Sequence, residues 1–560
     1  MTDPTNPVVA DHVNSGGGSW ADFNNDGYLD LFVASGNDSS RNSSLYLNDQ
    51  KGGFIKVMTG PVVDHAATSI GGTWGDYNND GKLDLFVTSR LFSVSYGNFL
   101  YQGNGDTLFA KISAPGPGTD IANSNSSSWV DVDGDGNLDL FVVNFQGNNF
   151  LYYNSGPPSY SFTRVDTGDI VLDGTAFSIV GVWADYNNDG KPDLFIGNAG
   201  SQNDLIFTNN GNGHFTKTIL NDGRSTLGAS WGDYDNDGYL DLFVANYTSQ
   251  NNILYHNSGP PDYTLTRVDT GIVSNDGGSS VGSVWGDFDN DGDLDLFVCN
   301  DGQNNALYLN NGPPTYGFTK VTLGAEVNDG GNSFGCSAAD YDNNGSLDLF
   351  VANRLGRQNF LYRNEGNGNA WVNIRCVGGT VNRSAIGVKV RVKAVINGAS
   401  RWQMQEIGAQ SGYNSQTLSL HFGLGDASQI DSLRIEWSSG STESYTALPV
   451  NHNITVTQSA GLSGIARESN LLPGSFRLEQ NFPNPFNPTT TLRFEVAAPV
   501  FVTLKVFDLL GRDVATLVNE KKEIGKYSVS WDGASLPSGV YFSRLEAGSN
   551  IQTRKMILLK

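Results

Sequence analysis

The feature that most constrains this chain is an internal repeat. A segment with the pattern W-x-D-x-[ND]-N-D-G-x-L-D-L-F-V occurs seven times with small departures, and its first aspartate falls at positions 22, 76, 131, 185, 233, 287 and 340. Each unit also carries an L-Y-x-N segment, and most carry a later F-x-K/R segment. Short alternating runs divided by Gly, Asn and Asp, without helical periodicity, predict three or four β-strands per unit.

A repeat made only of short strands cannot bury both of its faces alone, whereas units packed radially around an axis can. We therefore predict an all-β protein in which residues 1–366 form a seven-bladed β-propeller. The segment NPVVADHVNSGGGSW, residues 6–20, resembles the end of a unit. We expect it to add a strand that completes the last blade.

Each repeat contains a nine-residue acidic loop with the order D-x-[DN]-x-[DN]-G-x-x-D. Ca²⁺ takes six to eight oxygen ligands, and side chains at positions 1, 3, 5 and 9 plus the backbone carbonyl of position 7 would supply them. Glycine at position 6 allows the positive φ of a sharp turn. Mg²⁺ is less suitable because it prefers octahedral geometry and retains several waters. We therefore predict about seven Ca²⁺ sites, one per blade.

The expected ligands fall into five sets, by position in the loop. Position 1 is Asp22, Asp76, Asp131, Asp185, Asp233, Asp287 and Asp340; position 3 is Asn24, Asn78, Asp133, Asn187, Asp235, Asp289 and Asp342; position 5 is Asp26, Asp80, Asp135, Asp189, Asp237, Asp291 and Asn344; position 7 is Tyr28, Lys82, Asn137, Lys191, Tyr239, Asp293 and Ser346; position 9 is Asp30, Asp84, Asp139, Asp193, Asp241, Asp295 and Asp348.

The seven loops are not equivalent. Loops three, five and six have aspartate at positions 1, 3, 5 and 9, so we expect them to bind Ca²⁺ well. Loop seven has Asn344 at position 5 and Ala338 in place of the preceding tryptophan, which predicts weak occupancy. Loop four has Pro192 before its last aspartate, which stiffens that loop. A structural role for the ions is favoured over a catalytic one.

Composition excludes some classes of partner. The chain has 58 Asp and Glu against 34 Lys and Arg, a formal charge of −24, which argues against nucleic acid or an anionic membrane as partner. We see no apolar run long enough for a transmembrane helix. The first residues, MTDPTNPVVADHV, do not have the charge and apolar pattern of a signal peptide.

The repeats resemble the FG-GAP/VCBS family of calcium-bearing propeller blades, also found in integrin α-subunits. After residue 366 the period ends. The stretches NRSAIGVKVRV, SGYNSQ and LHFGLGDASQIDSLRIEWSSG, within residues 367–457, resemble the ASPIC/UnbV module. We expect there a small β-sandwich-like domain that packs on the last blade.

A linker, residues 458–474, precedes a last β-sandwich-like domain at 475–560. Its segments NFPNPF (481–486), GR (511–512), SGVY (538–541) and the final strand at 555–560 resemble the C-terminal sorting domain of the type IX secretion system. The resemblance implies passage through the outer membrane of a Bacteroidetes-type Gram-negative bacterium with the help of the type IX translocon. The expected location is therefore extracellular or on the outer-membrane surface.

Three functions are compatible with these patterns. The first is a calcium-stabilised propeller that acts in binding or adhesion, with a surface glycan or protein as ligand, and not as an enzyme. The second is a structural subunit that forms a homo-oligomer, filament or surface layer through strand pairing of its tail. The third is a polysaccharide-active enzyme, which no acid–base constellation outside the acidic loops supports.

One motif resembles a catalytic signature. Gly278-Ser-Ser-Val-Gly282 fits the G-x-S-x-G pattern of hydrolase nucleophile elbows. It lies at the same position in the repeat as the glycine-rich turns before Trp20 and Trp74, and no helical pattern follows it. We therefore expect it to be part of a strand and to have no catalytic role.

Overall fold

The computed structural model describes residues 5–11, 14–36, 42–65, 67–90, 97–172, 176–410, 413, 417–463, 477–478, 481, 484, 486–496, 500–522, 525–534, 536–548 and 550–559. The chain divides into two compact units, Met1–Ile465 and Ala466–Lys560. Nearly all regular structure is β-strand, as predicted. Among the described residues, no helix combines the length and apolar character that crossing a bilayer requires.

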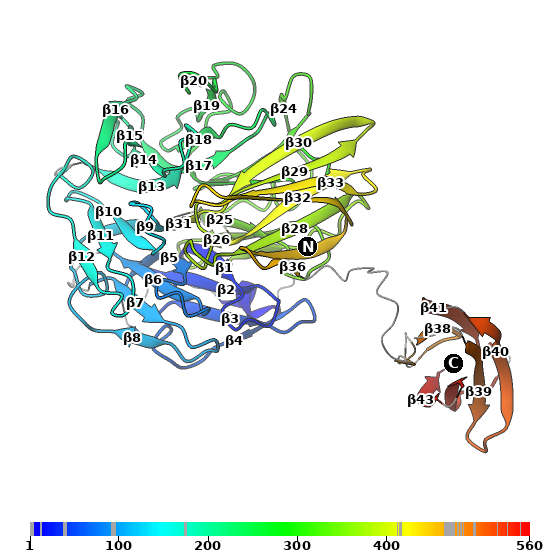
Figure 1. Cartoon of the computed structure of the whole chain (residues 1–560). Helices are drawn as coiled ribbons and strands as arrows, with labels where there is room; N and C mark the ends of the chain where they lie inside the picture. The colour runs from blue at the N-terminus through cyan, green and yellow to red at the C-terminus, as the bar shows by residue number, and fades with distance from the viewer. Residues whose placement is uncertain are drawn as a thin grey trace. The chain divides into compact units, whose positions relative to one another are not determined.

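The repeats form seven successive antiparallel sheets (Figure 1). The innermost strands are β1 (Ser15–Ala21), β5 (Ser69–Gly75), β9 (Ser124–Val130), β13 (Ser178–Ala184), β17 (Thr226–Gly232), β21 (Ser280–Gly286) and β25 (Ser333–Ala339). The second strands are β2 (Asp30–Ser35), β6 (Asp84–Ser89), β10 (Asp139–Asn144), β14 (Asp193–Asn198), β18 (Asp241–Asn246), β22 (Asp295–Asn300) and β26 (Asp348–Asn353).

The third strands correspond to the L-Y-x-N segments and the outer strands to the F-x-K/R segments. The third strands are β3 (Ser44–Asn48), β7 (Phe99–Gln102), β11 (Phe150–Asn154), β15 (Leu205–Asn209), β19 (Ile253–Asn257), β23 (Ala306–Asn310) and β27 (Phe360–Tyr362). The outer strands are β4 (Phe54–Lys56), β8 (Ala110–Ile112), β12 (Phe162–Arg164), β16 (Phe215–Ile219), β20 (Leu265–Arg267) and β24 (Phe318–Lys320).

The innermost strands contact one another in ring order, from β1 through β5, β9, β13, β17 and β21 to β25, and β25 contacts β1. Stacked aromatic pairs join neighbouring sheets. Tyr77 of loop two stacks on Trp129 with ring centroids 5.9 Å apart, and Tyr341 of loop seven stacks on Trp20 at the same separation. The last repeat is therefore closed onto the first in a propeller-like ring.

The prediction that residues 6–20 complete the last blade as a strand is wrong. Residues Ser15–Ala21 form the inner strand of the first sheet, and Pro7–Ala10 form a short helix, α1, that contacts β4 and β27. Pro7 at the helix start and the Asn6 cap, which accepts from Val8 N–H, favour this turn over a strand. In the described residues the seventh sheet keeps three strands.

Residues after the seventh sheet form two further sheets with a common core, and these belong to the same compact unit. We call this part the second module. Its strands are β28 (Ala370–Val377), β29 (Lys389–Ile396), β30 (Ala399–Glu406), β31 (Ala409–Gln410), β32 (Ser419–Gly425), β33 (Ile430–Glu436), β34 (Thr442–Leu448), β35 (His452–Thr457) and β36 (Gly461–Ser463). The sheet orders are β32-β28-β35-β36 and β30-β29-β33-β34.

The second module reaches into the ring. Short strand β31 pairs with β9 of the third sheet, and the backbone carbonyl of Tyr413 accepts a hydrogen bond of 3.0 Å from Cys336 N–H in the seventh. Tyr413 is 4% exposed and packs in one cluster with Ile70, Ile179 and Val281, which come from three different sheets. The prediction that this module packs on the last blade was therefore too narrow.

Unit two contains two sheets around its own core, with orders β37-β38-β41 and β40-β39-β42-β43. Its strands are β37 (Arg477–Leu478), β38 (Thr489–Val496), β39 (Val500–Asp508), β40 (Asp513–Lys522), β41 (Gly525–Asp532), β42 (Gly539–Ala547) and β43 (Asn550–Leu558). Most of the predicted linker, from residue 464 on, and residues 482, 483, 485 and 560 of the sorting motifs lie outside the described residues. The boundary at 366/367 stays a prediction.

Candidate metal sites and an adjoining cleft

The acidic loops connect the innermost strand of each sheet to the second strand. Position 1 directly follows the innermost strand, and position 9 is the first residue of the second strand. The turn between these strands therefore brings both aspartates to one end of the sheet. Glycine 6 has φ between 84° and 99° in every loop, which a residue with a Cβ adopts only with strain. The fixed glycine of the pattern is therefore required by backbone geometry.

Backbone N–H groups orient the position-1 and position-5 side chains. In all seven loops the N–H of glycine 6 donates to Oδ2 of aspartate 1 at 2.7–3.1 Å. The N–H of position 7 donates to Oδ1 of position 5 at 2.8–3.0 Å. Backbone hydrogen bonds alone therefore hold these side chains in the same arrangement in all seven loops.

The position-9 aspartates are buried. One oxygen of each accepts a backbone N–H from the end of the third strand at 2.7–2.9 Å. Burial, with a further contribution from neighbouring aspartates, raises the pKa of Asp30, Asp139 and Asp193 to about 8 and of Asp348 to about 9. Ionised carboxylates in this environment require a compensating positive charge.

Within the described part of the chain, four carboxylate oxygens of these loops are buried and have no hydrogen-bond partner: Oδ2 of Asp30, Oδ1 of Asp131, Oδ2 of Asp193 and Oδ1 of Asp289. Buried acceptors of this kind are rare in folded proteins unless water or an ion satisfies them. Hard oxygen donors around a shared point are the ligands Ca²⁺ takes. The residues present therefore fit a bound cation in loops one, three, four and six.

Carboxylate oxygens converge most closely in four loops. Among the described residues, the groups whose ligand atoms all lie within 4.8 Å of one another are Asp131/Asp133/Asp139, Asp233/Asp235/Asp241, Asp287/Asp289/Asp291 and Asp340/Asp342/Asp348, with Asp235/Asp237/His256 as a fifth group in loop five. Loops one, two and four have asparagine at position 3, so an acidic triad of this kind is not available there. These clusters could hold a metal ion.

Two side chains approach the loops, one from third strand β19 and one from the residue after third strand β27, and the repeat pattern does not point to either. Arg363 Nε lies 2.6 Å from Asp342 Oδ2 in loop seven. His256 Nδ1 lies 3.2 Å from Asp241 Oδ1 and 3.4 Å from Asp235 Oδ2 in loop five. The cation of Arg363 and the amide of Asn344 both reduce the negative charge of loop seven. The weak occupancy expected there stays a prediction.

Two position-7 side chains form ion pairs. The Asp293 carboxylate lies 3.2 Å from Arg401 of the second module, and the Lys191 ammonium lies 2.9 Å from Asp189. Only the backbone carbonyl of a position-7 residue is predicted to bind an ion. These ion pairs involve side-chain atoms and not that carbonyl.

The second module contacts every acidic loop, so it covers the face of the ring on which the loops lie. The contacts, in loop order, are Arg375–Asp22 at 3.6 Å, Ser384 Oγ–Asp76 N at 2.9 Å, Thr380 O beside Gly136, Lys389–Asp185 at 2.8 Å, Arg391–Gly238 O at 3.4 Å, Arg401–Asp293 at 3.2 Å and Asn373–Asp340 at 3.1 Å.

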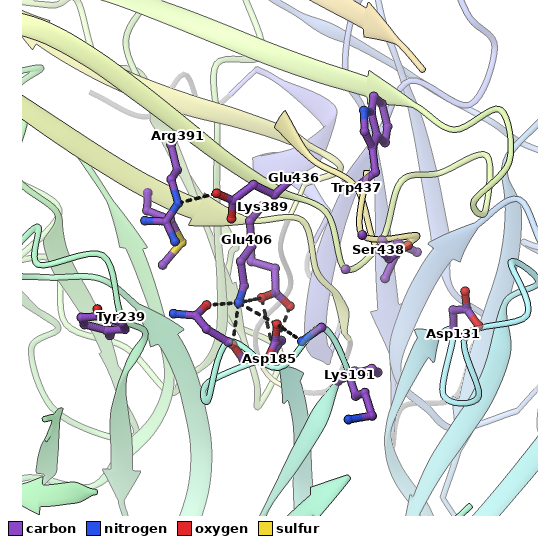
Figure 2. A pocket seen from close by; sticks show the side chains of 18 of the residues that line it. Asp131, Asp185, Lys191, Tyr239, Lys389, Arg391, Glu406, Glu436, Trp437 and Ser438 are labelled. Carbon is purple, nitrogen blue, oxygen red and sulfur yellow. Dashed lines mark hydrogen bonds and ion pairs between the residues drawn. The ribbon is translucent and has the colours of Figure 1, made fainter. Parts of the chain in front are cut away.

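A cleft of about 1010 Å³ separates part of the module from loops three to five. At its base, Lys389 Nζ lies 2.8 Å from Asp185 Oδ2, and the Glu406 carboxylate accepts from Asp185 N–H at 3.3 Å. Figure 2 shows this cluster between Tyr239 and Asp131, with Arg391 paired to Glu436 beyond it. Burial raises the pKa of Glu406 to about 7, and Lys389 opposes that shift.

Sequence reasoning missed the role of the asparagine in L-Y-x-N. In six sheets its Nδ2 donates to the backbone carbonyl of position 2 in the preceding acidic loop, at 2.7–3.0 Å. The second sheet has Gly103 at this place. The signal was the repeated asparagine itself, a buried amide that needs partners.

The G-x-S-x-G segment is structural, as expected. Ser280 lies in β21, is 1% exposed and donates to Asn300 Oδ1 at 2.9 Å. The chain continues as an extended strand, so the sharp strand-to-helix turn of a nucleophile elbow does not form here.

Comparison with known families identifies three segments. Residues 22–87, 131–196, 185–244, 233–298 and 287–351 match the FG-GAP-like repeat, together more than half of the chain. Residues 378–463 match ASPIC and UnbV, and residues 480–559 match the secretion system C-terminal sorting domain. The sorting domain marks a type IX secreted protein of Bacteroidetes, extracellular or on the cell surface.

No curated protein matches the chain. Among solved structures, a protein of Agrocybe aegerita, described by its recognition of non-reducing terminal N-acetylglucosamine, is 16% identical over 64% of this chain and 92% of its own, with a TM-score of 0.40. PorZ of Porphyromonas gingivalis is 12% identical over 95% of this chain and 58% of its own, with a TM-score of 0.35. The V. cholerae biofilm matrix protein Bap1 is 12% identical over 95% and 90%, with a TM-score of 0.29. Scores this low support no function for this chain.

Proposed function

The chain belongs to the FG-GAP-like repeat family, and from this premise we propose that it is a calcium-stabilised propeller that works outside the cell by binding another molecule. Calcium would be held by the acidic loops and would fix the ring and the second module that covers it. The partner would be a surface glycan or protein. We propose binding and not catalysis.

The observation that carries the calcium proposal is the set of buried, unpartnered carboxylate oxygens in loops one, three, four and six. A protein does not bury ionised carboxylates without compensation. Bound Ca²⁺ would supply the positive charge and take oxygen ligands from positions 1, 3, 5, 7 and 9. The repetition of one ligand order in seven loops supports the same ion at each.

Binding is favoured over catalysis by the chemistry of the cleft. Three buried ionisable groups of its lining, Lys389, Glu406 and Asp185, are engaged with one another, with 6%, 9% and 11% of their side chains exposed. A general acid or base needs access to the proton it transfers. Groups locked in a mutual ion pair support a structural role.

Calcium removal tests the proposal. For sites with dissociation constants of about 0.1 mM, millimolar Ca²⁺ would stabilise the fold by about 1.4 kcal/mol per site. Excess chelator should therefore lower the melting temperature of the first unit strongly, and calorimetric titration should find several equivalents of Ca²⁺.

A pair of variants makes this test site-specific. Asp139→Asn should lose one equivalent of bound Ca²⁺. Asp269→Asn, at an exposed aspartate paired with Arg267, should bind as much as the wild type. Identical melting curves with and without chelator would rule out calcium stabilisation.

A further inference from the structure

We propose that the cleft between acidic loops three to five and the sheet β30-β29-β33-β34 binds an acidic oligosaccharide. This inference rests on the proposed binding function and adds the site and the chemical class of the ligand. Its volume of about 1010 Å³ is at the upper end of the range of small-molecule pockets, which suits several linked sugar rings.

The module side of the cleft carries three cations, Lys389, Arg391 and Arg434, against two carboxylates, whereas the loop side carries five aspartates and one lysine. The Ca²⁺ ions proposed for loops three to five would offset those aspartates and leave the lining positive. Arg391 Nε and Arg434 Nε both lie 3.1 Å from the same oxygen, Oε1 of Glu436. Among the described residues, no second carboxylate pairs with either guanidinium. Arg434 keeps 49% of its side chain exposed, so its remaining N–H groups can reach a ligand carboxylate or sulfate.

Aromatic rings lie on both sides of the cleft. Trp402 on β30 lines the module side and is 40% exposed. Tyr239 and Tyr263 line the loop side, with ring centroids 5.7 Å apart at an angle of 73°. The C–H faces of sugar rings pack on such aromatic faces while the sugar hydroxyls bond to polar neighbours, so aromatic and charged groups together favour a saccharide over a simple anion.

Polar atoms on the module side also lack partners. Trp437 Nε1 and Ser438 Oγ are buried and have no hydrogen bond to any residue that the structure describes, and both residues line the cleft (Figure 2). Unpaired buried polar atoms in a native fold call for water or a ligand. Both atoms have almost no exposed surface, so an ordered water in the wall of the cleft would be their partner, and a sugar hydroxyl would reach them through that water.

The cleft is also closed at its base by the Lys389–Asp185 ion pair, which ties the module to loop four. The two walls therefore come from different parts of the chain but are held at a fixed spacing. A preformed site of this kind loses less conformational entropy on binding than a mobile one.

The experiment uses the full chain in buffer with millimolar Ca²⁺ and follows binding of a galacturonate hexamer by calorimetry. Trp402→Ala and Arg434→Gln should each weaken binding at least tenfold. Both side chains are substantially exposed, so melting temperatures should stay at the wild-type value. The matched control is Arg267→Gln on outer strand β20, which should bind the hexamer as the wild type does.

Three further probes define the ligand class: a neutral glucose hexamer, its sulfated derivative and a hexaglutamate peptide. We expect binding of the galacturonate or the sulfated hexamer, and the tighter of the two identifies the preferred acid. Equal binding of the neutral hexamer would overturn the requirement for acid. Binding of hexaglutamate alone would overturn the assignment to a sugar and indicate an acidic peptide.

Other outcomes separate this inference from the proposed function. If the wild type and both cleft variants bind the acidic hexamers equally, the cleft is not the site, although the binding function stands. If no hexamer binds to protein that calcium does stabilise, the acidic-oligosaccharide assignment fails and the calcium role stands. If calcium has no effect on melting while the hexamer binds as expected, the calcium proposal fails and the cleft assignment stands.

Discussion

At the scale of single residues, the same few polar side chains join neighbouring repeats and shape the acidic loops. Asn154 shows this: its Nδ2 donates to Tyr77 O of the preceding loop at 2.9 Å and to Leu138 O of its own loop at 3.1 Å, while its Oδ1 accepts from Gly156 N–H at 3.1 Å. It is 3% exposed. One amide thus satisfies backbone groups in two sheets.

Replacement of this amide should be costly. Asn154→Ala leaves buried carbonyls without donors, so we expect a loss of about 2 kcal/mol in the free energy of unfolding. Urea denaturation of the calcium-loaded protein measures it. Asn104→Ala, at the exposed neighbour of Gly103 where the second sheet lacks the amide, should cost less than about 0.5 kcal/mol. Equal costs would show that the amide does not join the sheets.

At the scale of elements, β29 and β30 hold the second module on the ring through one buried ion cluster. Lys389 on β29 pairs with Asp185 at 2.8 Å and lies 3.9 Å from Glu406 on β30. Removal of one member of a buried pair leaves an uncompensated charge, whereas removal of both charges does not.

Lys389→Met alone should therefore lower stability by about 3 kcal/mol. The double variant Lys389→Met/Glu406→Gln should recover part of that loss, because it removes one of the two buried carboxylates beside the lysine and leaves only Asp185. Thermal melting of the two variants beside the wild type checks this. A double variant no more stable than the single one would mean that packing of the lysine stem, and not charge, matters here.

At the scale of the whole molecule, the chain consists of two compact units with separate cores. The first contains the ring and the second module, and the second contains the sorting domain. Because each core is complete within its own unit, their stabilities should be independent.

Deletion of residues 466–560 should accordingly leave the melting temperature and the calcium equivalents of the first unit unchanged. Differential scanning calorimetry of the full and shortened chains compares them directly. A large drop in the melting temperature of the shortened chain would show that the sorting domain stabilises the ring.

The repeat pattern was sufficient to predict the strands, the acidic loops and their order around the ring, because the same local sequence pattern occurs in all seven units. It was not sufficient for contacts made once. The β31–β9 pair and the Asp293–Arg401 ion pair join residues more than a hundred positions apart, and no periodic signal marks them. Asn6 and Pro7 are a local signal for the start of helix α1. The resemblance of residues 6–20 to the end of a repeat nevertheless favoured the prediction of a strand.

The closure of the ring has a mechanical consequence. In the described chain, no sheet is shared between the first and last repeats, and side-chain contacts such as the Trp20–Tyr341 stack join them. The chain leaves β27 directly into β28, so tension on the C-terminal end of the first unit enters the second module first. Since that module contacts all seven acidic loops, the force is shared among contacts that must shear together. A pull on that end therefore does not open the ring at its seam one hydrogen bond at a time.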